Sequence, residues 1–403
     1  MSDVRPEERE PSRNLTSTRR KVIVFRSELL PPSETFIREQ TSALRRWEPI
    51  LVGRRIARNT LPLDGLVVKT TETRIVSALM RIAPRWASSL CRRALLKALR
   101  GIDAQLVHVH FGVDAVDIWP VVSQLRLPML VTLHGYDINI RREWWENGKG
   151  GHYRRQYPKQ LLEMANAANV RFVAVSEAIR RRAIEYGIPA KKVAVRYIGV
   201  DTAKFSPGSV PFPLRPCRVL FVGRLVEKKG TEYLIRAFAA VSQRVCAAEL
   251  VIVGDGPLRL SLEALSESLE LNVRFLGTLS SERIRQEMQG ARVFCLPSVR
   301  ARNGDAEGFG LALLEAQSCG LPVVTSASGG STEGLLEAQT GFAFPEKDEY
   351  VLADLLTKML QDERLCGELS INSVAFVRER FDLYSCTAAI EREYDYSMDG
   401  TAV

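Results

Sequence analysis

Two glutamates, Glu307 and Glu315, are the first candidates for chemistry, because carboxylates eight positions apart on one helix can border the same pocket. The leucine-rich run between them predicts a helix that opens near Glu307, and Gly320 is a good candidate for its C-cap. On such a helix the two side chains lie within roughly 80° of each other and about 12 Å apart along the axis. By spacing alone, two glutamates on an ordinary surface helix are the more common explanation.

The residues that follow Glu307 would place free backbone N–H groups at the positive end of the same helix. These residues are Gly308, Phe309, Gly310 and Leu311. Glycines allow a ligand to approach the backbone closely, and the start of a helix favours anions. The sequence therefore predicts an anion site, and phosphate is the natural anion.

A basic loop, GRLVEKKG of residues 223–230, follows the strand expected over RVLFV. Arg224 could bind a diphosphate through forked hydrogen bonds, and Lys229 could bind it as a point charge. Two basic residues in a loop are often only solvated, so this loop alone does not define a site.

The run EGFGLALLEA, followed by CGLPVV, resembles the signature of retaining glycosyltransferases of the GT-B fold, in the GT4-type family also described as glycosyl transferases group 1. That family includes bacterial mannosyl-, glucosyl- and galactosyltransferases of polysaccharide synthesis, and the chain resembles its exopolysaccharide and colanic acid subgroup. The resemblance covers nearly all of residues 21–396 and is strongest over 218–345. It implies that Glu307 meets the donor sugar and that Glu315 meets the ribose hydroxyls of the nucleotide.

The resemblance also implies roles for two basic residues and a histidine. In the family, the pair that Arg224 and Lys229 match holds the leaving diphosphate. His134, in the setting TLHGYD at the end of an expected strand, resembles the active-site histidine that contacts the donor sugar beside the reacting carbon. Apart from this resemblance, a histidine at a strand end is more often structural. His108 and His110 point the same way along the preceding strand and could form a metal pair, but no third ligand stands at a recognisable spacing.

The loop after the first strand, ELLPPSET, lies where an open α/β sheet usually binds its ligand. Related transferases carry glycines in this loop, whereas Ser33, Glu34 and Thr35 occupy it here, as in polysaccharide-assembly members of the family. We expect these three residues and Asp137 on the acceptor side of the cleft. The alternative is that Ser33 caps the following helix and Glu34 lies in its first turn.

The β-α rhythm of both halves predicts an α/β protein with two parallel sheets, each covered by helices on both faces. The family resemblance implies that they form two Rossmann-like domains that face each other across a cleft, which is the GT-B fold. The first residues lack an apolar core, and four prolines mark a linker in mid-chain. The expected boundaries are a disordered tail over 1–20, an acceptor-side domain over 21–200, a linker over 201–217, a nucleotide-sugar-binding domain over 218–380, and a C-terminal helix over 381–396 that crosses back to the first domain.

The net charge of +9 is unevenly distributed along the 403 residues. Residues 1–205 hold 36 Lys and Arg against 20 Asp and Glu, whereas the rest of the chain holds 20 against 27. A basic half could face nucleic acid, an anionic membrane or a phosphorylated substrate. The sequence carries no nucleic-acid signature, so an anionic membrane surface and a pyrophosphate-linked acceptor rank above nucleic acid.

A basic stretch over 72–100, which Pro84 splits, suggests a helix lying on an anionic membrane, although a solvated face of an ordinary covering helix would look the same. The seven cysteines are odd in number and widely spaced, which is typical of a reduced cytoplasmic protein. No window approaches eighteen apolar residues, so no spanning helix is expected. These features predict a cytoplasmic protein that is peripheral on the inner face of the cytoplasmic membrane.

The family resemblance, taken with the basic first half of the chain, implies a retaining glycosyltransferase that moves a hexose from GDP-mannose or a UDP-hexose to a hydroxyl of a polyprenyl-pyrophosphate-linked saccharide. No cofactor is expected, and no metal ion, because the chain lacks the Asp-x-Asp pair that commonly holds a divalent ion in the other main transferase fold. The alternatives are a sugar-nucleotide epimerase of the same fold and a non-catalytic sugar-nucleotide-binding protein. A dinucleotide oxidoreductase is disfavoured, since no G-x-G-x-x-G follows the first strand.

Overall fold

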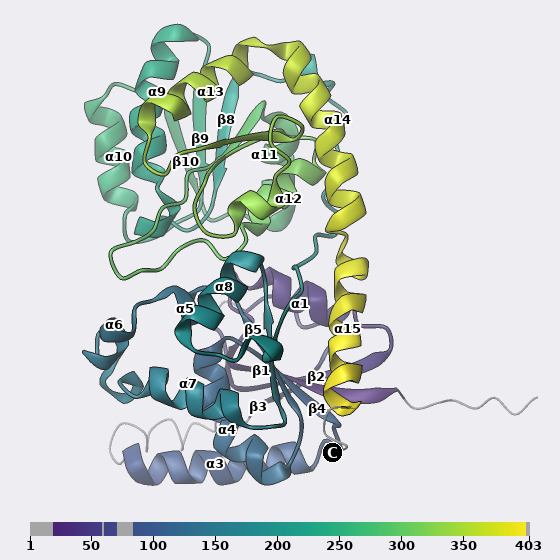
Figure 1. The fold of residues 1–403 in the computed structure, drawn as a ribbon. Helices are drawn as coiled ribbons and strands as arrows, with labels where there is room; N and C mark the ends of the chain where they lie inside the picture. Colours follow the sequence, from purple (N-terminus) through teal and green to yellow (C-terminus); the bar gives the residue numbers. More distant parts are fainter. Residues whose placement is uncertain (1–18, 59, 71–83, 400–403) are drawn as a thin grey trace, which may run out of the picture.

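The computed structural model describes residues 19–58, 60–70 and 84–399. Within these residues, two parallel sheets of seven and six strands are each flanked by helices and stand one above the other (Figure 1). This confirms the α/β class and the two Rossmann-like sheets expected from the sequence. The tail expected over 1–20 lies almost entirely outside the described residues, as do Arg74 and Arg81 of the basic stretch.

The first sheet has the strand order β3-β2-β1-β4-β5-β6-β7. Its central strands β4 and β5 are buried along their whole length, as expected for parallel strands covered on both faces. β2 is as long as β1, because it pairs with β1 along nearly its whole length. The strands are β1 (Arg20–Leu29), β2 (Trp47–Ile56), β3 (Val67–Thr70), β4 (Leu106–His110), β5 (Met129–Leu133), β6 (Val170–Ala174) and β7 (Val193–Val195).

The second sheet has the strand order β10-β9-β8-β11-β12-β13. As in the first sheet, the strand order runs outward in both directions from the strand that comes first in the chain. Its strands are short runs rich in Val, Leu, Ile and Phe, and β11 and β12 are buried throughout. The strands are β8 (Arg218–Val222), β9 (Glu249–Val253), β10 (Val273–Gly277), β11 (Val293–Leu296), β12 (Val323–Ser326) and β13 (Gly341–Phe344).

Helices connect the strands and cover both sheets (Figure 1). Around the first sheet they are α1 (Thr35–Ser42), α3 (Pro84–Arg100), α4 (Gly112–Leu125), α5 (Tyr136–Asn139), α6 (Arg142–Glu146), α7 (Tyr157–Asn166) and α8 (Glu177–Tyr186). Around the second sheet they are α9 (Thr231–Arg244), α10 (Arg259–Ser268), α11 (Ser281–Gly290), α12 (Leu311–Ser318), α13 (Glu349–Gln361) and α14 (Glu363–Arg380).

The last helix, α15 (Leu383–Asp399), packs on the first sheet although it follows the second in the chain. In Figure 1, α14 and α15 form a yellow column that runs from the upper sheet to the lower one. Glu391 of α15 accepts hydrogen bonds from the backbone amides of Arg45, Arg46 and Trp47 at 2.9, 2.7 and 3.1 Å. The chain end therefore ties the two halves together.

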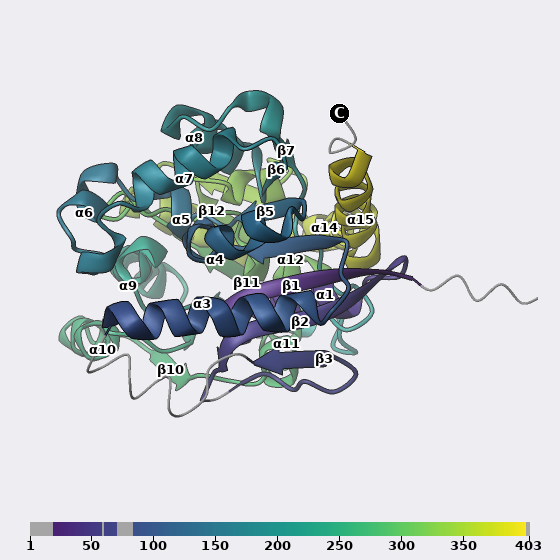
Figure 2. The ribbon, with the colours of Figure 1, turned by 90° about the horizontal axis from the view of Figure 1, so that it is seen from below.

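Helix α3 lies across the outer side of the first sheet (Figure 2). Its buried side chains Leu95 and Leu99 join the core, whereas Leu90 is 44% exposed. The opposite face is basic and exposed, and among the described residues its cations have no salt bridge; they are Arg92, Arg93, Lys97 and Arg100. Across the described ranges, every helix is too short or too polar to pass through a lipid bilayer.

Candidate active site

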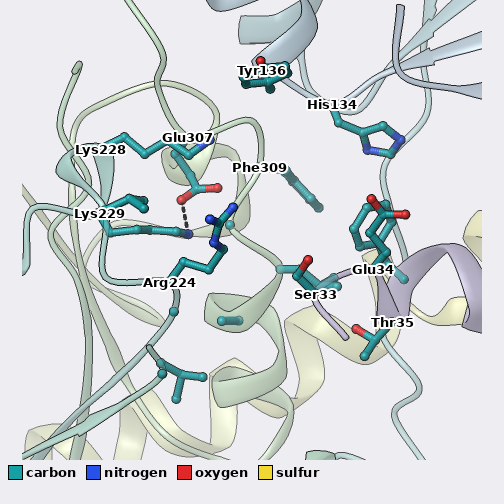
Figure 3. A pocket seen from close by; sticks show the side chains of 18 of the residues that line it. Ser33, Glu34, Thr35, His134, Tyr136, Arg224, Lys228, Lys229, Glu307 and Phe309 are labelled. Atoms are coloured by element: carbon teal, nitrogen blue, oxygen red, sulfur yellow. Dashed lines mark hydrogen bonds and ion pairs between the residues drawn. The ribbon is translucent and has the colours of Figure 1, made fainter. Parts of the chain in front are cut away.

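A cavity of about 1010 Å³ lies where strands of both sheets end. Phe111 and His134, which follow β4 and β5, line it from the first sheet, and Gly223 and Gly254, which follow β8 and β9, line it from the second. Ligands of open parallel sheets bind at these carboxyl ends. Figure 3 shows side chains from both halves turned toward the same space.

Glu307 lies in a loop, and the expectation that it opens a helix is wrong. Helix α12 begins only at Leu311, after Gly310 has taken a left-handed backbone conformation with a φ of 87°. The helical spacing used to relate the two glutamates therefore does not apply. Glu307 and Glu315 nevertheless both line the cavity, one from the loop and one from the helix.

Glu307 is only 8% exposed and is held by a lysine. Its Oε2 accepts hydrogen bonds from Nζ of Lys229 at 2.5 Å and from Oγ of Ser298 at 3.2 Å. Burial alone would raise the pKa of Glu307, but the charges of Lys229 and Lys228 outweigh burial and lower this pKa to about 2. Glu307 is therefore a fixed carboxylate that lines the cavity.

Three cations line the wall that belongs to the second sheet (Figure 3). Lys229 is paired with Glu307, and Nζ of Lys228 lies 3.0 Å from Oδ2 of Asp305. Arg224 is exposed, and the described part of the chain offers it no ion-pair partner. The sequence indicated Arg224 and Lys229 but not Lys228, although the two lysines are adjacent.

The expected row of amides is only partly in the cavity. Phe309, Gly310 and Leu311 line it, and the start of α12 leaves its first N–H groups without helical partners. Gly308 is instead pressed against the first half of the chain, since a Cβ added there would lie 2.1 Å from the carbonyl oxygen of His134. Gly308 is therefore an interdomain contact, and the ligand-facing role of its amide stays a prediction.

Glu315 lines the cavity from α12, and within the described ranges its carboxylate has no hydrogen-bond partner. Burial and the nearby charge of Glu39 raise the pKa of Glu315 to about 7, while Lys204 lowers it. A half-buried acid with unused hydrogen-bonding capacity is suited to meet hydroxyl groups of a ligand.

His134 lines the cavity from the end of β5. Its Nε2 lies 3.0 Å from Nδ1 of His110, and its ring packs against Phe36 and Phe111 with centroid distances of 4.9 and 4.5 Å. Burial and the charge of Arg26 hold the pKa of His134 well below its usual value, so the imidazole is neutral.

The metal pair considered for His108 and His110 does not form a metal site in the described residues. Both ring nitrogens of His108 are engaged, Nδ1 with the hydroxyl of Tyr394 at 2.8 Å and Nε2 with that of Thr132 at 2.7 Å. No group of three potential ligand side chains gathers in the described ranges.

The loop carrying Ser33, Glu34 and Thr35 lines the cavity opposite the cations (Figure 3). Glu34 binds Arg26 through two hydrogen bonds, of 2.9 and 2.5 Å. Arg26 also binds Asp114, which lies 88 positions away in the sequence. Ser33 does not cap α1, because the N-cap position belongs to Glu34 and has no side-chain hydrogen bond.

Asp137 does not face the acceptor side, and that expectation is wrong. It is fully buried and does not line the cavity. Its carboxylate accepts hydrogen bonds from the amides of Gly112 and Gly135, both at 2.9 Å, and of His134 at 3.2 Å. Burial outweighs these bonds and raises the pKa of Asp137 to about 6. Asp137 thus shapes the turn that carries His134.

Two charged cavity residues were not anticipated from the sequence. Arg26 and Asp114 bring opposite charges into the first sheet's wall. A charged residue within the apolar strand VIVFRSE was the available signal for Arg26. Its partner Asp114 could not be identified without the fold.

Two family models together match most of the chain: Glycosyltransferase Family 4 over residues 33–204 and Glycosyl transferases group 1 over residues 204–374. The chain is 31% identical over 279 residues to the colanic acid biosynthesis glycosyltransferase WcaL of Escherichia coli K12, covering 67% of this chain and 66% of that protein. It is 32% identical over 263 residues to the amylovoran biosynthesis glycosyltransferase AmsK of Erwinia amylovora, covering 65% and 62%. These matches span slightly less than two thirds of either relative.

Among solved structures, Anabaena HepE in complex with UDP and glucose superimposes with a TM-score of 0.77 at 20% identity, covering 94% of this chain and all of that one. Sucrose-phosphate synthase from Thermosynechococcus elongatus gives a TM-score of 0.73 at 20% identity, covering 94% and 99%. Both similarities establish the fold. The chain belongs to the glycosyl transferases group 1 family and has its two-domain GT-B fold.

Proposed function

We propose that this protein is a retaining glycosyltransferase of polysaccharide biosynthesis, which transfers a hexose from a nucleotide diphosphate sugar to a hydroxyl of a lipid-linked saccharide. The observation that carries the proposal is the convergence of Glu307, three cations and His134 on one cavity at the start of α12. The names of WcaL and AmsK as polysaccharide-biosynthesis glycosyltransferases support it, and so does the UDP-glucose complex of Anabaena HepE.

The donor would lie mainly against the second sheet. Arg224 and Lys229, with the first amides of α12, bind the diphosphate, and Glu315 accepts hydrogen bonds from the ribose hydroxyls. The bond between the anomeric carbon and the β-phosphate oxygen breaks, and negative charge grows on that phosphate. Cations already in place stabilise this charge more in the transition state than in the ground state.

The sugar would lie between Glu307 and His134. The acceptor oxygen forms the new bond to the anomeric carbon from the face that the diphosphate leaves, which gives retention. The acceptor's proton passes to the departing phosphate oxygen, so no protein nucleophile is needed. The three cations supply the positive charge, and we propose that neither a metal ion nor a cofactor takes part; activity that is lost in a chelator and restored by a divalent ion would contradict this.

The acceptor would enter along the first sheet's wall, past Ser33, Glu34 and Thr35. We propose a polyprenyl-pyrophosphate-linked saccharide, presented at the anionic inner surface of the cytoplasmic membrane. The exposed basic face of α3 supports this surface as a partner, since each Lys or Arg near an anionic membrane contributes about 1 kcal/mol.

Membrane binding is tested by sedimentation with vesicles containing anionic phospholipid. The double variant Arg92→Ser/Arg93→Ser should lose binding at low salt, whereas Arg364→Ser/Arg378→Ser, which removes the same charge from α14 on the other half, should keep it. Equal binding of both variants would remove α3 from the proposal.

The central experiment incubates the protein with a panel of labelled UDP- and GDP-sugars and a bacterial lipid extract. Label on lipid supports transfer and identifies the donor. Release of an epimerised sugar nucleotide would instead support an epimerase, and tight binding without turnover would support a non-catalytic sugar-nucleotide-binding protein. Either of these outcomes overturns the proposed reaction.

A further inference from the structure

Three of the four histidines of the chain lie side by side at the ends of β4 and β5. The ring centroids of His108 and His110 are 4.4 Å apart, and those of His110 and His134 are 5.3 Å apart. Only His134 of these three lines the cavity. His110 is 1% exposed and has no role in the reaction proposed above.

The surroundings of His134 leave one ring nitrogen for a ligand. Phe36 and Phe111 pack against the ring, and Nε2 is committed to Nδ1 of His110 at 3.0 Å. Phe111 adopts a positive φ of 73°, which is costly for a bulky aromatic residue and is typically kept where a site requires it. Nδ1 of His134 is therefore the nitrogen available to the cavity.

The position of Arg26 indicates which nitrogen of His110 carries the hydrogen. Phe25 of β1 pairs with Val109 of β4, so Arg26 and His110, which follow them, lie beside each other. Burial lowers the pKa of His110, and so does the repulsion that a second proton on His110 would meet from Arg26 and from protonated His108 or His134, so His110 carries one ring hydrogen. β4 lies between β1 and β5, so Nδ1 of His110, which faces His134 at the end of β5, is turned away from Arg26 at β1. The positive charge of Arg26 therefore favours the hydrogen on Nδ1.

We infer that His110 is a positioning residue that donates its Nδ1 hydrogen to Nε2 of His134 and thereby fixes His134 as the neutral Nδ1–H tautomer, with a hydrogen-bond donor directed at the ligand. The hydrogen bond made at one nitrogen of an imidazole sets the tautomer of the other. That the ligand atom is an oxygen of the donor sugar rests on the proposed function. The tautomer itself does not.

Nitrogen-15 spectra of the imidazoles test this on the ligand-free protein, because the four histidines give few signals. His152 is exposed in the short 3-10 helix His152–Arg154, and in the described ranges its ring does not contact the other three histidines, so His152→Gln assigns its own signal and serves as the matched control. In the wild type and in His152→Gln, we expect His134 to carry its hydrogen on Nδ1. A hydrogen on Nε2 of His134 in the wild type would overturn the inference, and this measurement needs no variant of the cluster.

Two variants of His110 test the cause. His110→Phe keeps a ring but removes the donor, and should move the hydrogen of His134 to Nε2, the nitrogen that a free histidine favours. His110→Gln keeps an N–H donor and should retain the Nδ1–H tautomer. An Nδ1–H tautomer that persists in folded His110→Phe would show that His110 does not set it.

The kinetic consequence is measured with the donor that the panel identifies. His110→Phe should lower kcat by about tenfold with little change in the donor KM, the size of effect seen when an outer partner of a functional histidine is lost. His110→Gln should recover most of this loss, and His152→Gln should not change the rate. A wild type without any transfer would refute the proposed function and leave the tautomer result standing.

Discussion

The carboxylate of Glu333 accepts a hydrogen bond from the backbone amide of Ala178 at 2.8 Å and thereby links the two halves of the protein. Glu333 also accepts from the amide of Glu177 at 2.7 Å and from the hydroxyl of Tyr197 at 3.2 Å. The two amides begin α8, where the helix dipole favours a negative charge. Beside them, Oγ of Ser176 donates to the carbonyl of Gly308 at 2.7 Å. The loop that carries Gly308 is therefore docked on the start of α8.

Replacing Glu333 with Ala should loosen this docking. We expect a loss of about 1 kcal/mol in the free energy of unfolding, the usual cost of losing a helix cap, and a several-fold fall in kcat/KM because Gly308 and His134 are less firmly held together. Urea unfolding and donor turnover measure the two effects. Glu368→Gln, an exposed change on α14, is the control, and equal behaviour of the two variants would show that the link is not functional.

Glu307→Gln tests the buried pair with Lys229. We expect a loss of transfer of roughly 10²-fold or more, because the amide cannot hold the ammonium as the carboxylate does. The variant should also change how the free energy of unfolding depends on pH. The pKa of Glu307 in the folded protein, about 2, lies below its ordinary value of 4.5, so its ionised form stabilises the fold above pH 4.5 and this stabilisation is lost as the pH falls toward 2.

The difference in unfolding free energy between wild type and Glu307→Gln should therefore be largest near neutral pH, on the order of 3 kcal/mol, and should narrow between pH 5 and pH 3. Urea titrations at several pH values measure it. A difference that is independent of pH would mean that the ionised pair contributes little to stability.

The sheets could be predicted from the sequence because each buried strand is a short apolar run that alternates with a helical pattern. The start of α12 could not be, since it depends on the left-handed backbone of Gly310, and a glycine at that position is equally compatible with a helix that begins earlier. Glu307 is therefore expected on a helix from the sequence, whereas in the structure it lines the cavity from a loop.

The direction of the side chains at strand ends also could not be predicted from the sequence. Asp137 and His134 are three positions apart in one turn, yet one points inward to backbone amides and the other lines the cavity. The sequence contains no information on which amides a short carboxylate will reach. The pairing of Arg26 with Asp114, likewise, appears only when β1 and β4 are placed side by side.

Glu315→Gln should separate stability from function. The pKa of Glu315 in the folded protein, about 7, lies above its ordinary value of 4.5, so folding favours its protonated form. The stability that this provides is present below pH 4.5 and is lost as the pH rises through 7. Glu315→Gln should therefore be more stable than the wild type by roughly 1–3 kcal/mol at pH 8 and equal to it at pH 4.

The same variant should bind the nucleotide sugar less tightly if the carboxylate accepts hydrogen bonds from the ribose. Calorimetric titration with the donor found in the panel measures this, and 2′-deoxy and 3′-deoxy nucleotides give the matched comparison. If Glu315 contacts the ribose, removal of a ribose hydroxyl should weaken binding to the wild type clearly. It should weaken binding to Glu315→Gln only slightly. Equal additional losses in both proteins would place the ribose elsewhere.

Arg224 and Lys229 both line the cavity, but they should respond differently to replacement by Ala. Arg224 is exposed and has no ion-pair partner in the described ranges, so Arg224→Ala should change the unfolding free energy by no more than about 0.5 kcal/mol. Lys229→Ala leaves the buried carboxylate of Glu307 without its closest cation, which typically costs about 3 kcal/mol or more.

Both variants should nevertheless lose affinity for UDP or GDP, because each removes a cation that faces the diphosphate. Arg224→Lys keeps the charge but not the fork of donors, and should recover only part of the affinity. Measuring binding and urea unfolding on the same samples separates the two roles. Unchanged nucleotide affinity in stable Arg224→Ala would place the diphosphate away from this wall of the cavity.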